Sequence, residues 1–170
     1  AQAMQQRFPD LPLASATRGL VAWNNGSLPS ALRWLSRAVR SMTKTPSSPR
    51  LEALIRVLYG RTFSDSGRLG QALEQFNAAH KACPLCPDPL HQQALALEEQ
   101  GKNSEAIRAL RQAMTLDPKK PELYFDLAKT YESAGRIQDA ITMYTRYLGF
   151  DPPAELARTA RSAMSALRRR

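Results

Sequence analysis

The chain lacks several patterns that would define its chemistry. No apolar run is long enough to cross a membrane as a helix. There is no glycine-rich loop of the kind that cradles a phosphate, and no serine stands at a strand-to-helix elbow beside a histidine. Aromatic residues make up 7% of the chain, and none lies in a basic run that would stack on nucleic-acid bases. These absences argue against an enzyme and against a protein that spans a membrane.

The glycines that are present follow a regular spacing. Gly67, Gly101 and Gly135 are 34 residues apart, and each stands five residues before an alanine. A fixed period of this size indicates stacked copies of one supersecondary unit. Each copy reads as two helices that are joined by a turn at the glycine and ended by a proline. Gly26 has the same place in an earlier and fainter copy, in which Pro29 falls in the first turn of the second helix.

This pattern resembles the tetratricopeptide repeat family. The small residues that this family requires correspond to Gly60, Ala72, Ala79, Ala94, Ala106, Ala113, Ala128 and Ala140. Its large apolar places correspond to Phe63, Phe76, Leu97, Leu110, Tyr131 and Tyr144. Two residues depart from the pattern. Tyr147 replaces a small residue, which predicts looser or rearranged packing against the final helix, and Gln93 replaces a leucine. The resemblance implies an all-α, right-handed α-solenoid of helix-turn-helix repeats.

The spacing also predicts how the chain is divided. We expect four repeats over residues 12–154, at 12–45, 53–86, 87–120 and 121–154, with an insertion at 46–52 that contains Pro46 and Pro49. Residues 1–11 are expected to end a preceding repeat. Residues 155–170 are predicted to form a capping helix, because they carry one apolar stripe. Its members are Leu156, Ala157, Ala160, Ala163, Met164 and Leu167.

Positive charge is concentrated near the beginning of the chain. The net charge is +9, and residues 1–52 carry seven basic residues against two acidic ones. Arg33, Arg37, Arg40 and Lys44 fall at helical spacing along one face of the first repeat's second helix. This basic face is either an ordinary solvated surface or a patch for an acidic protein, a nucleic acid or an anionic lipid.

All cysteines and histidines lie within twelve residues, at His80, Cys83, Cys86 and His91. Two thiolates and two imidazoles suit tetrahedral zinc, but the resemblance to the repeat family implies that His91 and His80 lie on different helices and point in different directions. A disulfide between Cys83 and Cys86 is a second alternative. Two unbonded turn cysteines are the favoured interpretation. No cofactor or metal is therefore predicted.

In the resembling family, the first helices of successive repeats line a concave groove that holds a peptide or a helix. The groove-facing places correspond here to Leu13, Ala16, Leu20, Trp23, Leu54, Val57, Arg61, His91, Leu95, Phe125 and Lys129. The first half of this groove is apolar, with Trp23 as an anchor, unless a preceding repeat or residues 1–11 cover it. The clamp by which some members hold a terminal carboxylate is absent. Its places here are Ala16, Leu20, Leu58, Asp88 and Gln92.

The function expected from these residues is that of a non-catalytic scaffold or adaptor, which binds a segment of a partner protein in the groove. The excess of arginine over lysine is typical of GC-rich bacterial genomes, and bacterial members of the family often serve in assembly of a secretion, envelope or motility apparatus. The alternative is a binder of nucleic acid or of an anionic surface through Arg33, Arg37, Arg40 and the terminal arginines. The cytoplasm is favoured over the periplasm, and the oligomeric state is undetermined.

Overall fold

The computed structural model describes residues 11–43 and 47–169. Within these residues every regular element is an α-helix, and no helix is long and apolar enough to cross a membrane. Lys44 of the predicted basic face, Pro46 of the predicted insertion and residues 1–10 lie outside the described residues. The helices are α2 (Pro12–Asn24), α3 (Leu28–Ser41), α4 (Pro49–Asp65), α5 (Leu69–Ala82), α6 (Pro87–Glu99), α7 (Asn103–Leu116), α8 (Pro121–Ser133), α9 (Ile137–Leu148) and α10 (Ala154–Leu167).

The turn inside each helix pair is made at a glycine with a left-handed backbone. At Gly26, Gly67, Gly101 and Gly135 the φ angles are 73°, 71°, 74° and 71°. A side chain at such a φ would crowd the backbone, so only glycine adopts it without cost. The next amide then closes the preceding helix by reaching back five residues, as Arg68 N–H does to the Phe63 carbonyl at 2.9 Å. The predicted glycine turns are confirmed.

Prolines begin the first helix of every pair. Pro12, Pro49, Pro87 and Pro121 are the first residues of α2, α4, α6 and α8. A proline costs nothing there, because the first amide of a helix has no intrahelical acceptor. At α4 the Ser48 hydroxyl also accepts a hydrogen bond from Leu51 N–H at 3.2 Å. Pro29 lies in the first turn of α3, as its place in the sequence predicts.

Small residues lie where the helices pack most closely. The alanines five residues after the turn glycines are fully buried, since Ala31, Ala72, Ala106 and Ala140 are each 0% exposed. Larger side chains fill the space between the helices of a pair; Leu35, Phe76, Leu110 and Tyr144 are among the largest that are fully buried. This alternation of small and large residues is why the family pattern predicts the core so well.

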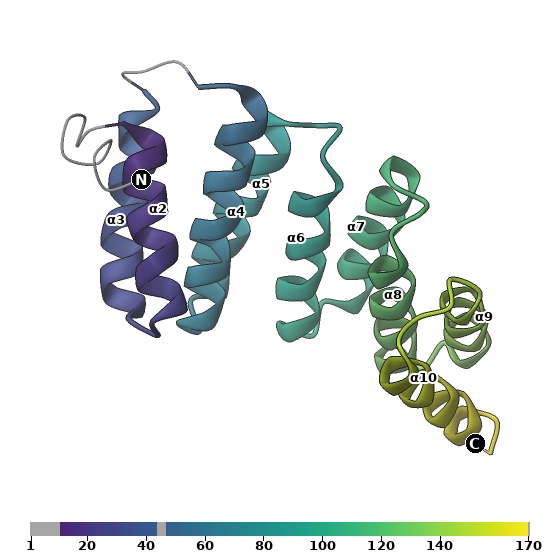
Figure 1. The fold of residues 1–170 in the computed structure, drawn as a ribbon. Helices are drawn as coiled ribbons and strands as arrows, with labels where there is room; N and C mark the ends of the chain where they lie inside the picture. The colour runs from purple at the N-terminus through teal and green to yellow at the C-terminus, as the bar shows by residue number, and fades with distance from the viewer. Residues whose placement is uncertain (1–10, 44–46, 170) are drawn as a thin grey trace. The chain divides into compact units, whose positions relative to one another are not determined.

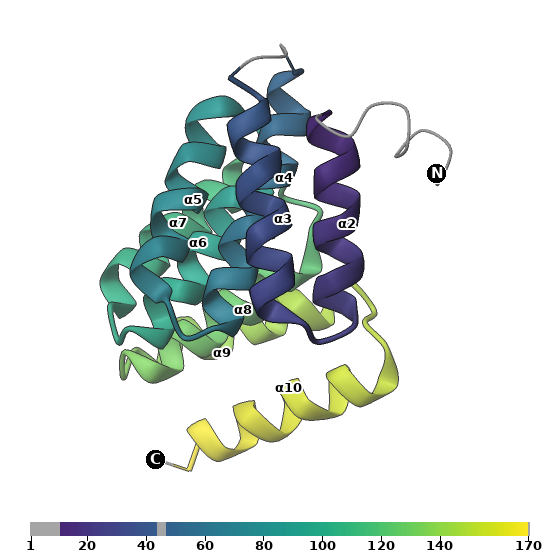
Figure 2. The same ribbon diagram turned by 90° about the vertical axis from the view of Figure 1, so that its left-hand side faces the viewer.

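The chain forms two compact units, and the division falls within α6. Unit 1 ends at Gln92 and contains α2 to α5 with the first half of α6; unit 2 begins at Gln93 and contains the rest. In unit 1, α2 packs against α3 and α4, and α4 against α5 (Figure 1). Figure 2 shows α2, α3 and α4 from a second side. The predicted repeats at 12–45, 53–86, 87–120 and 121–154 stay a prediction, and the sequence did not predict the division within α6.

In unit 2, α8 packs against α7 and α9, and α10 packs against α9. The buried face of α10 consists of Ala157, Ala160, Met164 and Leu167, which belong to the predicted apolar stripe. Leu156, also assigned to that stripe, is 46% exposed, because it lies at the edge of the face.

Candidate functional site

A hollow of about 250 Å³ lies between α2 and α4 of unit 1. It takes its walls from residues three or four apart on each helix, which share one helical face. We call it the α2–α4 hollow. Seven of the eleven residues predicted to face the groove line it, namely Leu13, Ala16, Leu20, Trp23, Leu54, Val57 and Arg61.

The rim of the α2–α4 hollow is unusually apolar for a surface. Leu13, Leu20 and Leu54 are 54%, 39% and 64% exposed. Ala16 and Ile55, which also line the hollow, are buried and belong to the core cluster of unit 1. Ala16 forms the floor of the hollow, because α2 turns that side toward α3 and α4. The leucines of the rim are therefore exposed above a packed floor.

Trp23 is held in a fixed position at one end of this hollow. Its indole Nε1 donates a hydrogen bond to Asp65 Oδ2 at 2.5 Å, which links α2 to the last residue of α4. The Arg61 guanidinium carbon lies 4.6 Å from the centre of the Trp23 ring, within the range of a cation–π contact. Trp23 is also partly buried against the core cluster. The predicted anchor is thus already engaged by its own chain on one edge and over its ring.

The other predicted groove residues are placed differently. His91, in unit 1, is 7% exposed and offers little surface, so its role as a groove residue stays a prediction. It lies among buried residues in the first half of α6 because Pro89 and Leu90 are buried beside it. Leu95 and Lys129 lie in unit 2, the former partly buried and the latter exposed.

Phe125 packs into an aromatic group of unit 2. Its ring centre lies 5.7 Å from that of Tyr144 and 5.1 Å from that of Tyr147. Tyr147, which replaces a small residue of the family pattern, is buried in this group, so the packing is rearranged around the larger ring rather than loosened. Burial, with the charges of Glu122 and Asp126, raises the pKa of Tyr147.

Tyr144 carries the largest electrostatic shift in this group. Burial raises the pKa of Tyr144 well above its usual range, and the nearby Glu132 carboxylate raises it further. The Tyr144 hydroxyl donates a hydrogen bond to Glu132 Oε2 at 3.3 Å. A phenol in these surroundings stays protonated at every physiological pH, and its hydrogen bond links α9 to α8.

The basic face on α3 contains a feature that sequence reasoning missed. Trp34 lies among three arginines, with guanidinium carbons 4.7 Å from its ring centre for Arg18, 5.9 Å for Arg33 and 5.8 Å for Arg37. The spacing of Arg33, Trp34 and Arg37 along one helix could have indicated part of this cluster. The contribution of Arg18, from α2, depends on the packing of the helix pair.

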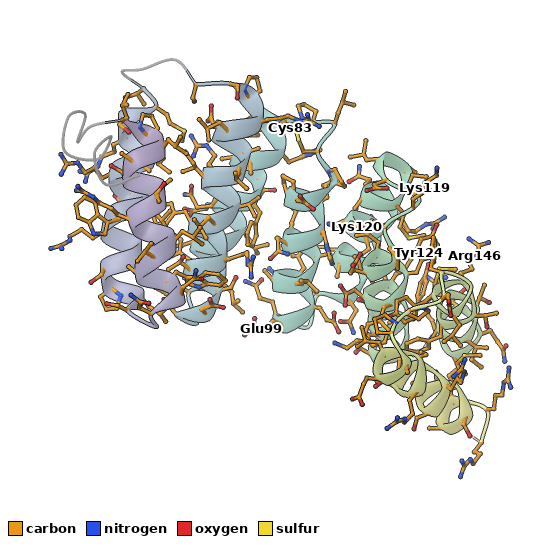
Figure 3. All side chains as sticks on the ribbon, viewed as in Figure 1. Cys83, Glu99, Lys119, Lys120, Tyr124 and Arg146 are labelled. Atoms are coloured by element: carbon orange, nitrogen blue, oxygen red, sulfur yellow. A yellow bond between two sulfur atoms is a disulfide. The ribbon has the colours of Figure 1, made fainter. Side chains whose placement is uncertain are left out.

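Cys83 and Cys86 form a disulfide with a Cα–Cα distance of 5.4 Å. The favoured interpretation of unbonded turn cysteines was therefore wrong. Cys83 follows the last residue of α5, and the bond closes the connection to α6, where Figure 3 labels Cys83. In the part of the chain that the structure describes, no group of three or more histidine, cysteine or acidic side chains is placed to hold a metal ion.

The geometry defines the class of the protein as an all-α helical-repeat protein with an exposed apolar hollow between the first helices of two successive pairs. Comparison with known proteins gives the family. Residues 97–164 match the family model of the tetratricopeptide repeat. The sequence resemblance to tetratricopeptide repeats is thereby confirmed. Comparison with curated proteins gave no match.

Solved structures of tetratricopeptide repeat proteins share the fold over most of the chain, which confirms the predicted α-solenoid class. MamA is 18% identical, with a TM-score of 0.73, over 88% of this chain and 81% of that one. YrrB, described as having an unusual peptide-binding site, is 16% identical with a TM-score of 0.74 over 93% and 78%. The first repeat domain of Spaghetti (RPAP3), bound to the HSP90 peptide SRMEEVD, is 20% identical with a TM-score of 0.64 over 69% and 97%.

Proposed function

We propose that this protein is a non-catalytic interaction scaffold that binds an apolar segment of a partner protein in the α2–α4 hollow. The observation that carries the proposal is the ring of exposed leucines around that hollow. Leu13 and Leu20 come from α2 and Leu54 from α4, and together they offer apolar surface that water solvates poorly. A short helix or an extended peptide with apolar side chains would cover it.

The hollow favours a partner with an apolar anchor side chain. Ile55 and Ala16 form a rigid floor, so an anchor that enters the hollow meets packed atoms rather than a collapsible space. Arg61 lies at one end and adds a positive charge at the rim. We therefore expect a partner segment with aliphatic or aromatic anchors and an acidic residue near one end.

Two of the compared structures support a role in peptide binding, since one holds an HSP90 peptide and another is described by its peptide-binding site. The carboxylate clamp of some family members has no counterpart at the corresponding places of this chain, which hold Leu20, Leu58 and Gln92 among others. The proposed partner is therefore bound through apolar side chains rather than through a terminal carboxylate.

The proposal extends to the setting of the interaction. A scaffold with this groove would fit the assembly of a bacterial secretion, envelope or motility apparatus, where family members often hold components together. The identity of the captured partner tests the proposed role in assembly of a bacterial apparatus. Mutation of the hollow tests the proposed binding surface.

The test is capture of a partner from lysate by the purified chain, at low and high salt, with variants of the hollow. Leu20→Asp and Leu54→Asp place a carboxylate on the rim and should abolish capture. Val21→Asp is the matched control, because Val21 is exposed on α2 but does not line the hollow. Tryptophan fluorescence and circular dichroism verify that each variant is folded. Equal capture by all three variants would refute the groove proposal.

A second candidate function rests on the arginines around Trp34. The guanidinium carbons of Arg18, Arg33 and Arg37 all lie within 5.9 Å of the centre of one indole ring, so positive charge is concentrated at this place on α2 and α3. The cluster would bind nucleic acid or another anionic surface. Such binding weakens steeply as salt rises, whereas groove binding persists. Arg33→Glu with Arg37→Glu should abolish the salt-sensitive component only.

A further inference from the structure

The Cys83–Cys86 disulfide suggests a function beyond partner binding. The bond joins residues three apart and spans the turn between α5 and α6. The turn also has hydrogen bonds of its own: Cys83 N–H donates to the Ala79 carbonyl, and Cys86 N–H donates to the Cys83 carbonyl, both at 3.0 Å. These two hydrogen bonds hold the ends of the turn, at Cys83 and Cys86, when the disulfide is open.

The sulfurs lie outside the core of unit 1. The fully buried residues of α5 are Ala72, Phe76 and Ala79, whereas both cysteines are only partly buried. Between them, Pro84 is exposed and Leu85 is 81% exposed. A reductant can therefore approach the bond without unfolding the helices. Because the closed ring contains only four residues, the bond also restricts the unfolded chain little.

The disulfide borders a second hollow, of about 290 Å³, which we call the disulfide hollow. Leu85 and Cys86 line it from one side, and Leu54 and Val57 of α4 line it from the other. Leu54 and Val57 also line the α2–α4 hollow, so one face of α4 contributes to both. All of these residues belong to unit 1.

We propose that Cys83–Cys86 is a thiol–disulfide exchange site, which a dithiol opens while unit 1 stays folded, and that opening it releases Leu85 from its place on the disulfide hollow. One thiolate of the dithiol attacks one cysteine sulfur. The Cys83–Cys86 bond breaks, a mixed disulfide forms, and the other cysteine leaves as a thiolate and takes up a proton. The second thiolate of the dithiol then attacks the dithiol sulfur that is bonded to the cysteine. The mixed disulfide breaks, and the remaining cysteine leaves as a thiolate and takes up a proton. Two electrons pass to the protein, and the dithiol ends as a disulfide.

The expected consequence is local. With the bond open, the turn is held at Cys83 and Cys86 by their two backbone hydrogen bonds alone, so Leu85 between them becomes more mobile. The face of α4 with Leu54 and Val57 then gains exposure. The redox state of the site would in this way change the surface that α4 presents, independently of whether the α2–α4 hollow binds a partner.

The first experiment is a titration of the folded chain with dithiothreitol, followed by alkylation and mass spectrometry. We expect two alkylated cysteines per chain, with tryptophan fluorescence and helical circular dichroism unchanged, and closure of the bond again on adding glutathione disulfide. Thiols that become reactive only in unfolding concentrations of urea would overturn the proposal, as would failure of glutathione disulfide to close the bond in the folded chain.

The second experiment is hydrogen exchange of the oxidised and reduced chain. The amides of Leu85, Cys86 and Asp88 should exchange severalfold faster after reduction, and α8 of unit 2 should be unchanged as an internal control. The Cys83→Ser, Cys86→Ser double variant should match the reduced chain without any reductant. If exchange at Leu85 is the same in both redox states, the release of Leu85 is refuted even where the bond opens.

Discussion

Three glycines of unit 1 provide a test of the packing argument by alanine substitution. An ideal Cβ built at Gly60 would lie 2.4 Å from Phe76 Cε1 and 2.7 Å from its Cδ1. These distances are far below the contact distance of two carbon atoms, which is about 3.5 to 4 Å. The Phe76 ring is 1% exposed, so it can yield only by displacing other core residues.

The expected free-energy change at Gly60 combines two opposed effects. Overpacking of a core costs about 1 to 3 kcal/mol. Alanine gains about 1 kcal/mol over glycine inside a helix, and Gly60 lies well within α4. Because the new Cβ would lie only 2.4 Å from the Phe76 ring, we expect an overpacking cost in the upper part of that range, about 2 to 3 kcal/mol. Gly60→Ala should then lower the unfolding free energy of unit 1 by about 1 to 2 kcal/mol.

Gly67 and Gly70 are the matched comparisons. A Cβ at either position meets nothing within 4 Å, but Gly67 has a φ of 71°. Gly67→Ala should therefore cost about 1 kcal/mol through backbone strain alone. Gly70→Ala should be neutral or stabilising by about 0.5 kcal/mol, because it lies in the first turn of α5 with neither obstacle.

The assay is urea unfolding followed by tryptophan fluorescence. Both tryptophans of the chain, Trp23 and Trp34, lie in unit 1, so the signal reports that unit alone. With a denaturant slope of about 2 kcal/mol per molar urea, Gly60→Ala should lower the midpoint of unfolding by about 0.5 to 1 M. Gly60→Ala and Gly70→Ala of equal stability would refute the close helix crossing. A double-mutant cycle with Phe76→Leu should show a favourable coupling, since the smaller side chain makes room for the new methyl group.

Three further predictions concern particular contacts. Asp65→Ala removes the acceptor of the Trp23 indole and should lower the stability of unit 1 by about 1 kcal/mol in the same assay, whereas Asp65→Asn should retain part of it. Burial raises the pKa of Tyr144 in the folded state, so its contribution to stability is present below about pH 10 and lost as the pH rises further. Tyr144→Phe should reduce the alkaline loss of helicity seen by circular dichroism; an unchanged alkaline transition would contradict this. Ala106→Leu should unfold unit 2, because Ala106 is 0% exposed, and tryptophan fluorescence should still show a folded unit 1. Ala166→Leu, at an exposed place on α10, is its control and should leave helicity unchanged.

The sequence alone predicted the class of fold, the glycine turns and the core alanines. The reason is that these features are local and periodic. A left-handed turn requires glycine wherever it occurs, as at Gly67 and Gly101, and a close helix crossing requires a small residue, as at Ala72. Each repeat has the same requirement at the same place, so the pattern can be recognised although the other positions vary.

The candidate site was predicted less completely. Seven groove residues fell around one hollow because α2 and α4 expose the faces that the family pattern assigns to them. The burial of His91 and the packing of Phe125 against Tyr147 could not be read from the same pattern. They depend on which neighbouring side chains are large, and this differs from repeat to repeat.

Only the tertiary structure decided the long-range contacts. Trp23 and Asp65 are 42 residues apart in sequence, and no local rule pairs an indole with a particular carboxylate at that distance. The contact of Arg18 with Trp34 and the division within α6 also depend on tertiary packing and follow from no local rule. The repeat period determined which faces of the helices meet, because that follows from spacing along the chain. Which side chains touch across those faces was decided by the angle and depth at which the helices pack.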